Sequence, residues 1–311
     1  MIVRWGLGEL DALAGAVPFV VAGPRWRDVL PDAERWEEVP SHRIEVPDAA
    51  DTIVAVGGGS AIDTAKAASA ATGLPLVSVP TTYSGAEWTT FFGVRDPERK
   101  LRGGGSGAHP TAIVYDAELT LTLPRAETVG TALNALAHCA EALYVRERTT
   151  QSDNDALEGA RLIGTWLPRV VEATDDLEAR SGLLRGACHA GAALGASMLA
   201  LGHAMAQALG GRYGVPHGAM NALTLPPTLR FNADVAAAQI ERFGVALGTD
   251  DPAAKVEELA RLGGFRRLRD LGLPPDAPAA VAEAAAARAG AKANPRPVTP
   301  DDVERLLRSI W

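Results

Sequence analysis

Residues 52–63 read TIVAVGGGSAID: a short apolar run of β-forming residues, three glycines and the first turn of a helix. Consecutive glycines let the backbone approach a phosphate group closely, and the N–H groups at the beginning of a helix favour an anion. We interpret the stretch as a pyrophosphate-binding turn, the alternative being a tight turn that holds no ligand. The predicted cofactor-binding residues are Gly57, Gly58, Gly59, Ser60 and Asp63, with Ser60 as N-cap and Asp63 completing a capping-box-like arrangement.

Similar short apolar runs lie on both sides of this stretch, at residues 17–22, 76–80 and 112–115. The alanine-rich run 61–72 is followed by Gly73, a typical stop signal for a helix. Strands and helices in this order predict a Rossmann-like α/β domain, in which crossover helices connect the strands of a parallel sheet. The glycine spacing matches neither G-x-G-x-x-G nor G-x-x-x-x-G-K-[ST], which argues against a P-loop kinase or NTPase.

A second cofactor signal is PTTYSGAE at residues 80–87, directly after the run that ends at Val79. Ligands of open α/β folds collect at the carboxyl edge of the sheet, and hydroxyl groups there suit a phosphate or a nicotinamide ribose. We therefore predict Thr81 and Thr82 as cofactor-binding residues. An ordinary polar loop is the alternative interpretation.

The character of the sequence changes after residue 124. From about Arg125 onward, strand-like alternation disappears and Ala/Leu-rich helical patterns dominate. We predict two domains, an α/β nucleotide-binding domain over residues 1–124 and an all-α catalytic and substrate domain over residues 125–311. Prolines in the tail predict short helices there, and the alanine-rich run 279–289 predicts a helix that stops at Gly290.

Composition limits the class of protein and its partners. The chain has 311 residues, a net charge of -8 and only two cysteines, Cys139 and Cys188. The negative charge argues against nucleic acid or an anionic membrane as partner, because either needs a basic face. Two cysteines in helical apolar stretches are expected to be small buried side chains, and the count excludes a disulfide framework. With no apolar run near 20 residues and no signal-like N-terminus, we expect a cytoplasmic protein.

Four side chains, Asn134, His138, His203 and His217, form a pattern like a metal site in which one ligand has been replaced. The spacing of Asn134 and His138 places both on one face of a predicted helix. Three neutral imidazoles and one carboxylate would suit zinc or ferrous iron. An asparagine offers only a neutral carbonyl oxygen in place of the carboxylate, so the pattern leaves open whether a metal is bound.

Together these passages resemble the iron-containing alcohol dehydrogenase family, within the wider dehydroquinate synthase-like group. The resemblance covers residues 51 to about 232 and a tail, and the maleylacetate reductase branch is the most similar in appearance. The pieces that carry it are VGGGS at 56–60 with Asp63 and Lys66, PTTY at 80–83 with Glu87, VYD at 114–116, NALAH at 134–138, EALY at 141–144, His203, PHG at 216–218 and NPRPVT at 294–299.

The resemblance implies a dehydroquinate synthase-like fold and transfer of a hydride from NADH or NADPH to the carbonyl of a small carboxylated substrate. Members of the maleylacetate reductase branch also have asparagine in place of the aspartate ligand, and they work without a metal. The resemblance further implies a homodimer. The implied catalytic residues are His138, His203, His217, Asn134 and Lys100, of which the three histidines would hold Fe or Zn if a metal were bound.

Three features depart from the family pattern. Between Trp36 and Asp51 there is room for a short strand but little for the customary crossover helix. Gln207 stands where the family often has a proton-relay histidine, and glutamine cannot titrate near neutral pH. Arg25 follows the first predicted strand in place of an acidic residue for the ribose hydroxyl, so it would favour NADPH unless it is an ordinary surface arginine.

These departures keep two alternatives to a metal-free reductase open. The first is a metal-dependent alcohol dehydrogenase with an altered ligand set. The second is a degenerate family member that binds a ligand without redox turnover, which the shortened nucleotide domain and Gln207 would favour. A lyase or cyclase of the dehydroquinate synthase kind is a weaker alternative, because that chemistry relies on an intact metal site.

Overall fold

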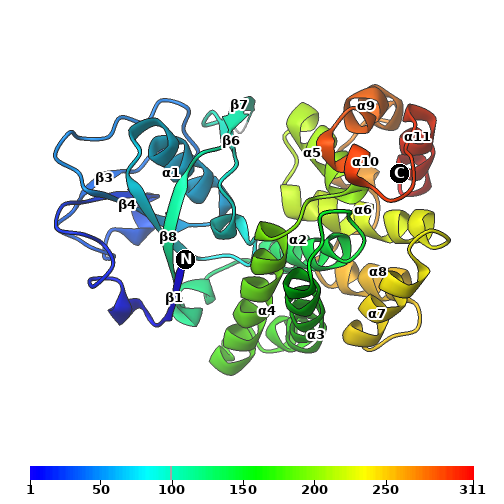
Figure 1. Cartoon of the computed structure of the whole chain (residues 1–311), viewed down its shortest axis with the longest axis horizontal. Coiled ribbons are helices and arrows are strands. Elements are labelled where there is room, and N and C mark those ends of the chain that lie inside the picture. The colour runs from blue at the N-terminus through cyan, green and yellow to red at the C-terminus, as the bar shows by residue number, and fades with distance from the viewer. Residues whose placement is uncertain (99) are drawn as a thin grey trace. The chain divides into compact units, whose positions relative to one another are not determined.

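A computed structural model of the chain describes residues 1–98 and 100–311, which fall into two compact units (Figure 1). The first unit comprises residues 1–82 and 86–122, and the second comprises residues 83–85 and 123–311. The strands are β1 (Ile2–Trp5), β2 (Pro18–Ala22), β3 (Glu34–Trp36), β4 (Thr52–Gly57), β5 (Pro75–Pro80), β6 (Phe92–Arg95), β7 (Leu101–Gly105) and β8 (His109–Tyr115). The helices are α1 (Gly59–Thr72), α2 (Arg125–Ala142), α3 (Thr150–Glu172), α4 (Leu177–Gly195), α5 (Leu201–Tyr213), α6 (His217–Asn232), α7 (Ala237–Leu247), α8 (Pro252–Leu262), α9 (Ala277–Ala286), α10 (Ala289–Ala293) and α11 (Pro300–Ser309).

The first unit is built on a six-stranded sheet in the order β1-β8-β5-β4-β2-β3, and all of its neighbouring strands are parallel. Side chains of β4 alternate between its two faces, as expected for a buried strand. Ile53 packs in a cluster with Ile62 and Ala65 of α1, whereas Val54 packs in a second cluster with Leu10. The predicted parallel α/β sheet is confirmed.

Several local predictions for this unit need correction. The sequence did not indicate β1, nor the antiparallel pair β6 and β7. Ser60 is not the N-cap of α1, because the helix already begins at Gly59 and Gly58 occupies the cap position without a side-chain hydrogen bond. The capping box is therefore wrong as well. The predicted lack of a crossover helix between β3 and β4 is confirmed, and α1 ends at Gly73 in the left-handed conformation as expected.

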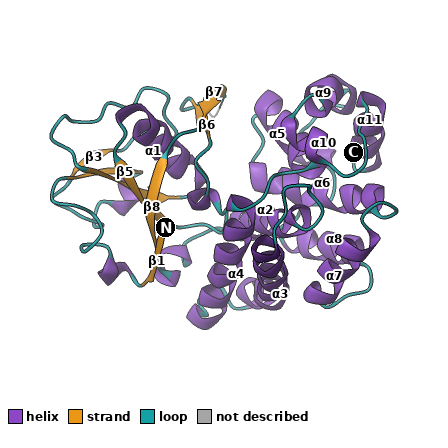
Figure 2. Ribbon diagram, in the orientation of Figure 1, coloured by secondary structure: helices purple, strands orange, loops and turns teal. Residues whose placement is uncertain are grey.

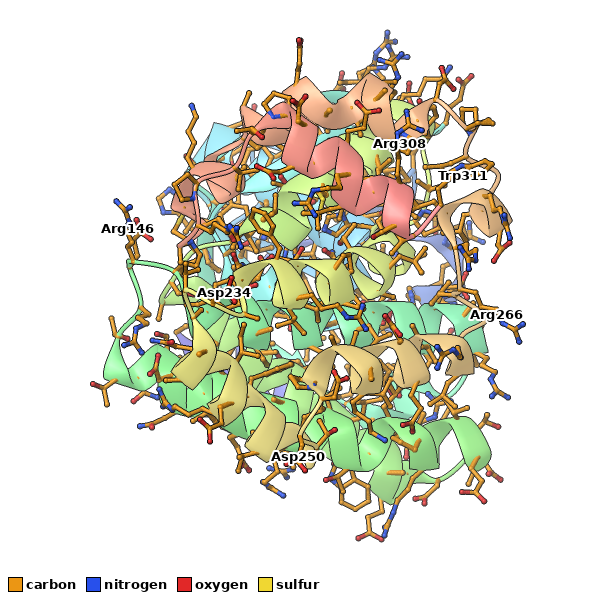
Figure 3. All side chains as sticks on the ribbon, turned by 90° about the vertical axis from the view of Figure 1, so that its right-hand side faces the viewer. Arg146, Asp234, Asp250, Arg266, Arg308 and Trp311 are labelled. Carbon is orange, nitrogen blue, oxygen red and sulfur yellow. The ribbon has the colours of Figure 1, made fainter. Side chains whose placement is uncertain are left out.

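The regular elements of the second unit are all helical, as Figure 2 shows. Helix α2 packs against α3, α4 and α6, and it is almost continuously buried from Thr128 to Ala142. Its alanine-rich sequence lets neighbouring helices approach closely. Charged side chains such as Asp250, Arg266 and Arg308 lie on the outside of the bundle (Figure 3).

The tail of this unit departs from prediction at one point. Helix α9 ends at Ala286, and Gly290 lies inside the next short helix, so it is not a helix stop. A Cβ atom at Gly290 would lie 2.6 Å from the carbonyl oxygen of Ala200, so glycine is needed for α10 to pack beside the beginning of α5. Further on, the side-chain amides of Asn294 and Asn232 bond each other reciprocally at 2.8 and 2.9 Å.

Both cysteines are free thiols in helices, Cys139 buried in α2 and Cys188 half-buried in α4. None of the helices within residues 1–98 and 100–311 is long and apolar enough to cross a membrane.

Candidate functional site

The glycine loop of the first unit lies where β4 and β5 end. Gly57 has a φ of 151°, which favours glycine, and a Cβ atom there would lie 2.8 Å from that of Ala61. A Cβ atom at Gly58 would lie 2.8 Å from Cγ2 of Thr82. The backbone N–H of Thr81 donates to the carbonyl of Gly57 at 3.0 Å, which ties the two strand ends together. The loop therefore requires glycine for packing as well as for any approach of a phosphate.

Two hydroxyl groups at this sheet edge are buried without a hydrogen-bond partner among the described residues, those of Thr81 and Thr82. A buried polar group without a partner is costly, so it often marks the place of a ligand or water. Helix α1 begins at the same edge with no side-chain cap, and Ser60 on its first turn is exposed. Donor and acceptor groups thus gather where the sequence predicted the cofactor.

A buried lysine organises the segment that follows this edge. Lys66 of α1 is fully buried, and its ammonium group donates to the hydroxyl of Thr89 at 2.7 Å and to the carbonyl of Phe91 at 3.1 Å. It also lies 3.7 Å from the carboxylate of Asp63, and Asp63 accepts a bond from the N–H of Gly93 at 3.3 Å. Asp63 thus has intramolecular partners in place of the predicted cap.

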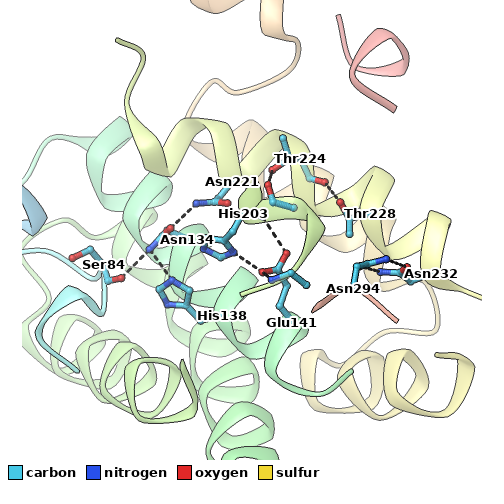
Figure 4. Close-up of polar contacts among 12 residues, drawn as sticks. Ser84, Asn134, His138, Glu141, His203, Asn221, Thr224, Thr228, Asn232 and Asn294 are labelled. Atoms are coloured by element: carbon cyan, nitrogen blue, oxygen red, sulfur yellow. Dashed lines mark hydrogen bonds and ion pairs between the residues drawn. The ribbon is translucent and has the colours of Figure 1, made fainter. Parts of the chain in front are cut away.

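The second unit brings three of the predicted histidines together. His138 comes from α2, His203 from α5 and His217 from the first residue of α6. The rings of His138 and His203 stack with their centroids 4.8 Å apart, and those of His203 and His217 are 5.8 Å apart. We call these three side chains the imidazole cluster; Figure 4 shows His138 and His203 with Asn134 and their polar contacts.

Asn134 lies one turn before His138 on α2, and its amide is held in one orientation. Its nitrogen donates to the carbonyl of Ser84 at 2.8 Å and lies 3.4 Å from Nε2 of His138. Its oxygen accepts a bond from the side-chain amide of Asn221, from α6, at 2.6 Å. Because Ser84 offers an acceptor and Asn221 a donor, the amide nitrogen faces His138 (Figure 4).

Glu141 is a residue whose role the sequence reasoning did not identify. Its carboxylate accepts bonds from the N–H of Ala200 at 2.6 Å and the N–H of His203 at 3.2 Å, at the beginning of α5. It also lies 2.7 Å from Nδ1 of the His203 ring. Gly202 makes room for it, because a Cβ atom there would lie 2.8 Å from Oε1. One buried carboxylate thus caps the helix and orients the imidazole that this helix carries.

Two ring nitrogens of the imidazole cluster make none of these contacts. With Nδ1 of His203 directed at Glu141, its Nε2 is buried without a partner among the described residues, as is Nδ1 of His138. Gly85 lies beside this second nitrogen, and a Cβ atom there would be 3.3 Å from it. Burial, together with the charges that His203 and His217 would carry, holds the pKa of His138 well below its usual range. His138 is therefore neutral at pH 7.

The remaining predicted residues have other surroundings. Lys100 belongs to the first unit, is exposed, and pairs with Glu98 at 2.5 Å, a contact that raises the pKa of the lysine. Gln207 lies on α5 one turn after His203, and its side-chain oxygen accepts a bond from Arg288 at 3.3 Å. Arg25 stacks on the ring of Trp26, with 4.4 Å between its guanidinium carbon and the ring centroid.

Comparison with known proteins places this geometry in a family. The sequence profile described as "Fe-containing alcohol dehydrogenase family, C-terminal" matches residues 128–311, and the profile "Iron-containing alcohol dehydrogenase" matches residues 43–117. The chain belongs to the iron-containing alcohol dehydrogenase family. It is an NAD(P)-dependent oxidoreductase of that family, as the resemblance implied.

Individual relatives agree with this assignment. A maleylacetate reductase of Sphingobium indicum is 39% identical over 260 residues, which are 83% of this chain and 73% of that protein. An iron-containing alcohol dehydrogenase of Corynebacterium glutamicum superposes with a TM-score of 0.88 at 31% identity, covering 100% of this chain and 94% of that one. A maleylacetate reductase of Agrobacterium tumefaciens gives a TM-score of 0.86 at 28% identity, with coverage of 100% and 95%. The predicted fold class, an α/β domain followed by a helical domain, is confirmed.

The family name implies iron, and the side chains of this member differ from the three imidazoles and one carboxylate that would suit it. Asn134 and the three histidines contribute no carboxylate. The nearby carboxylate of Glu141 is bound to the beginning of α5 and to Nδ1 of His203. At Asn134 the amide nitrogen, not the oxygen, faces Nε2 of His138, so Asn134 presents a hydrogen-bond donor to this ring and not a ligand oxygen. Among residues 1–98 and 100–311, no group of three or more His, Cys, Asp or Glu side chains has the arrangement of a metal site.

Proposed function

We propose that this chain reduces the carbonyl group of a small carboxylated substrate, as its maleylacetate reductase relatives are named to do, and that it does so without a metal. The observation that carries the proposal is the contact between Glu141 and Nδ1 of His203, which leaves a buried Nε2 without a partner among the described residues and so available to a ligand. Maleylacetate itself is the first substrate to test, because these relatives are 32–39% identical to the chain.

The nucleotide site of the proposal lies in the first unit. We assign Gly57, Gly58, Gly59, Ser60, Asp63, Thr81 and Thr82 to it. The two buried hydroxyls without partners and the uncapped beginning of α1 support this assignment, because both are suited to phosphate or ribose oxygens. NADH or NADPH, when bound, supplies the hydride.

His203 is the proton donor of the proposal. A carbonyl oxygen that receives a hydride at its carbon becomes basic and needs a proton. The carboxylate of Glu141 accepts the hydrogen bond of Nδ1–H of His203, so the proton that the ring can donate is the one on Nε2. After donation the imidazole is neutral, and its Nδ1–H remains bound to the carboxylate. Glu141 acts through His203 and is a positioning residue.

His138 and Asn134 have a different role from His203. The depressed pKa of His138 keeps this imidazole neutral, so it offers a hydrogen bond without a charge. Because Asn134 donates toward Nε2, the proton of neutral His138 is on Nδ1, the nitrogen without a protein partner. The neutral amide of Asn134 fits a pocket that orients an uncharged carbonyl, whereas an anionic residue there would repel a carboxylated substrate. The ring of His217 lies beside that of His203.

Gln207 supports the same assignment. A glutamine cannot carry a proton onward near neutral pH, so a relay through this position of α5 does not operate. His203 must then regain its proton from solvent, either by another route or by exchange after product release. The family resemblance also implies a homodimer and a catalytic role for Lys100, and we include both in the proposal.

The test is oxidation of NADH and of NADPH in the presence of maleylacetate, with nicotinamide fluorescence to measure cofactor binding. Before the assay, the protein is treated with a chelator and its metal content is measured. Turnover by the metal-depleted protein is the expected result. Absence of binding of either nucleotide contradicts the reductase proposal, and turnover that needs added Fe²⁺ or Zn²⁺ contradicts the metal-free mechanism.

A further inference from the structure

Arg288 is a cation whose surroundings no part of the proposed reaction explains. It lies between α9 and α10, is partly buried, and immediately precedes the first residue of α10. Its Nη1 donates to the side-chain oxygen of Gln207 at 3.3 Å. That partner is a neutral amide, and no carboxylate within the described ranges pairs with the guanidinium. The charge of Arg288 is therefore held in place without being neutralised.

The edge of this guanidinium that usually binds a carboxylate has no acceptor within residues 1–98 and 100–311. Nε of Arg288 is buried without a partner among the described residues, while Nη1 makes the bond to Gln207. Elsewhere in the chain the Nε and Nη2 edge holds a carboxylate side-on, at 2.6 and 2.5 Å between Arg27 and Glu37. The same geometry occurs at 2.8 and 2.6 Å between Arg161 and Glu158. Arg288 offers this edge to an acceptor from outside the chain.

The position of Arg288 relates it to the proton donor. Gln207 and His203 are four residues apart on α5 and therefore lie on one face, about 6 Å apart along the helix axis. The close approach of Gly290 to Ala200 fixes α10, and hence the residue before it, against the beginning of α5. That same beginning of α5 is held by Glu141. One helix thus positions both the imidazole and, through Gln207, the guanidinium.

We propose that Arg288, oriented by Gln207, binds a carboxylate of the keto-acid substrate and so selects carboxylated carbonyl compounds over simple alcohols and aldehydes. This inference rests on the proposed function and deepens it. The carbonyl oxygen would meet His203, and a carboxylate several bonds away would meet Nε and Nη2 of Arg288 in a side-on pair. This would explain Gln207 at the position of the missing relay histidine. Its neutral amide orients Arg288 but does not compete with the substrate carboxylate for the guanidinium.

Two variants from different elements and one control test this proposal. Arg288→Gln removes the charge, and Gln207→Glu keeps Arg288 but supplies an internal carboxylate next to it. The control is Arg212→Gln, because Arg212 is exposed, belongs to the same helix, and lies nine residues after His203 on the opposite face. Each full-length variant is assayed with maleylacetate and with a neutral aldehyde. Binding of adipate, a six-carbon dicarboxylate, is measured by calorimetry without turnover.

We expect Arg288→Gln and Gln207→Glu each to raise the KM for maleylacetate and the Kd for adipate about 10- to 100-fold, the loss typical of a charged hydrogen-bonded pair. The kcat and the KM for the neutral aldehyde stay within about threefold, and Arg212→Gln changes neither constant. Adipate binding that is absent in the parent protein, or equal in both variants and the parent, overturns the inference. Loss of turnover together with Arg288-dependent adipate binding overturns only the proposed reductase function.

Discussion

Two buried polar clusters, one in each unit, differ in how many of their polar atoms have hydrogen-bond or ion-pair partners. In the first unit the ammonium group of Lys66 has bonds to Thr89 and Phe91 and a nearby carboxylate in Asp63. In the second unit the imidazole cluster is oriented by Glu141 and Asn134, yet two ring nitrogens have no hydrogen-bond partner in the part of the chain that the structure describes. A cation whose hydrogen bonds are all made within the protein is suited to hold a segment in place. An oriented nitrogen without a partner is suited to bind a ligand.

The largest effect should come from the imidazole cluster. His203→Gln removes the proton donor, so we expect kcat to fall about 10²- to 10⁴-fold, the range of general acid catalysis. Nucleotide binding, measured by nicotinamide fluorescence, should stay unchanged. His189→Gln is the matched control, because His189 pairs with Asp155 at 2.9 Å and is 40% exposed. Equal activity in the parent and His203→Gln would remove His203 from the mechanism.

The lysine of the first unit should instead affect stability. Lys66→Met leaves the partly buried carboxylate of Asp63 without its cation, which we expect to lower the free energy of unfolding by about 3 kcal/mol. Denaturant titration measures this change. Lys255→Met is the control, since Lys255 forms a surface pair with Glu258 at 2.7 Å and should contribute less than about 1 kcal/mol. Equal stability of both variants would show that the buried lysine does not hold this segment.

A smaller catalytic effect is expected at the residue that orients the donor. Glu141→Gln keeps the size of the side chain but removes the carboxylate that lies 2.7 Å from Nδ1 of His203. We expect kcat to fall about 10- to 100-fold, as for other groups that orient a reacting imidazole. Nucleotide binding, measured by nicotinamide fluorescence, should stay unchanged, because the contact of Glu141 is with His203 and the beginning of α5. An unchanged kcat together with a loss of stability in denaturant titration would assign Glu141 to helix capping alone.

The glycine loop predicts a change in nucleotide affinity. In Gly58→Ala the new methyl group would meet Cγ2 of Thr82 at 2.8 Å, so the loop or the threonine must shift. We expect NADH or NADPH to bind about tenfold more weakly, equivalent to about 1.4 kcal/mol. Gly211→Ala serves as control, because a Cβ atom there has no neighbour within 4 Å. Unchanged nucleotide affinity in Gly58→Ala would place the nucleotide elsewhere.

The last prediction concerns the pH dependence of stability in the first unit. Burial raises the pKa of Glu87, although a hydrogen bond from Tyr115 opposes the shift. The folded state therefore holds the proton more tightly than the unfolded state, and the stability contributed by Glu87 is lost as pH rises from about 4.5 toward the folded pKa.

Glu87→Gln mimics the protonated acid at every pH. As pH rises over that range, the free energy of unfolding of Glu87→Gln should increase relative to that of the parent by about 1.4 kcal/mol per pH unit. Thermal unfolding between pH 5 and about 8 measures the difference, and parallel profiles of the two proteins would contradict the raised pKa.

Local features of the sequence could be predicted, while contacts between distant residues could not. The strand before the glycines, the stop at Gly73 and the shared face of Asn134 and His138 depend only on neighbouring residues. The contact of Glu141 with His203 joins residues 62 positions apart, and that of Arg288 with Gln207 spans 81. No spacing rule encodes such pairs, because the packing of separate helices brings them together.

The errors have local physical causes as well. Three consecutive glycines permit a helix to begin at more than one residue, so the sequence predicts the N-cap at Ser60, two residues after its actual place at Gly58. Gly290 was interpreted as a stop because glycine usually terminates a helix, whereas here it permits a close approach to Ala200. Strand β1 was missed because it is only four residues long and no residue in it is fully buried.

The central claim is that His203 with Glu141, and not a bound metal ion, delivers the proton during carbonyl reduction. It is tested most directly by measuring NAD(P)H oxidation with maleylacetate after exhaustive chelation, in parallel with elemental analysis of the same sample. The account predicts undiminished turnover in metal-depleted protein and its loss in His203→Gln. Turnover that vanishes on chelation and returns with Fe²⁺ or Zn²⁺ would contradict it.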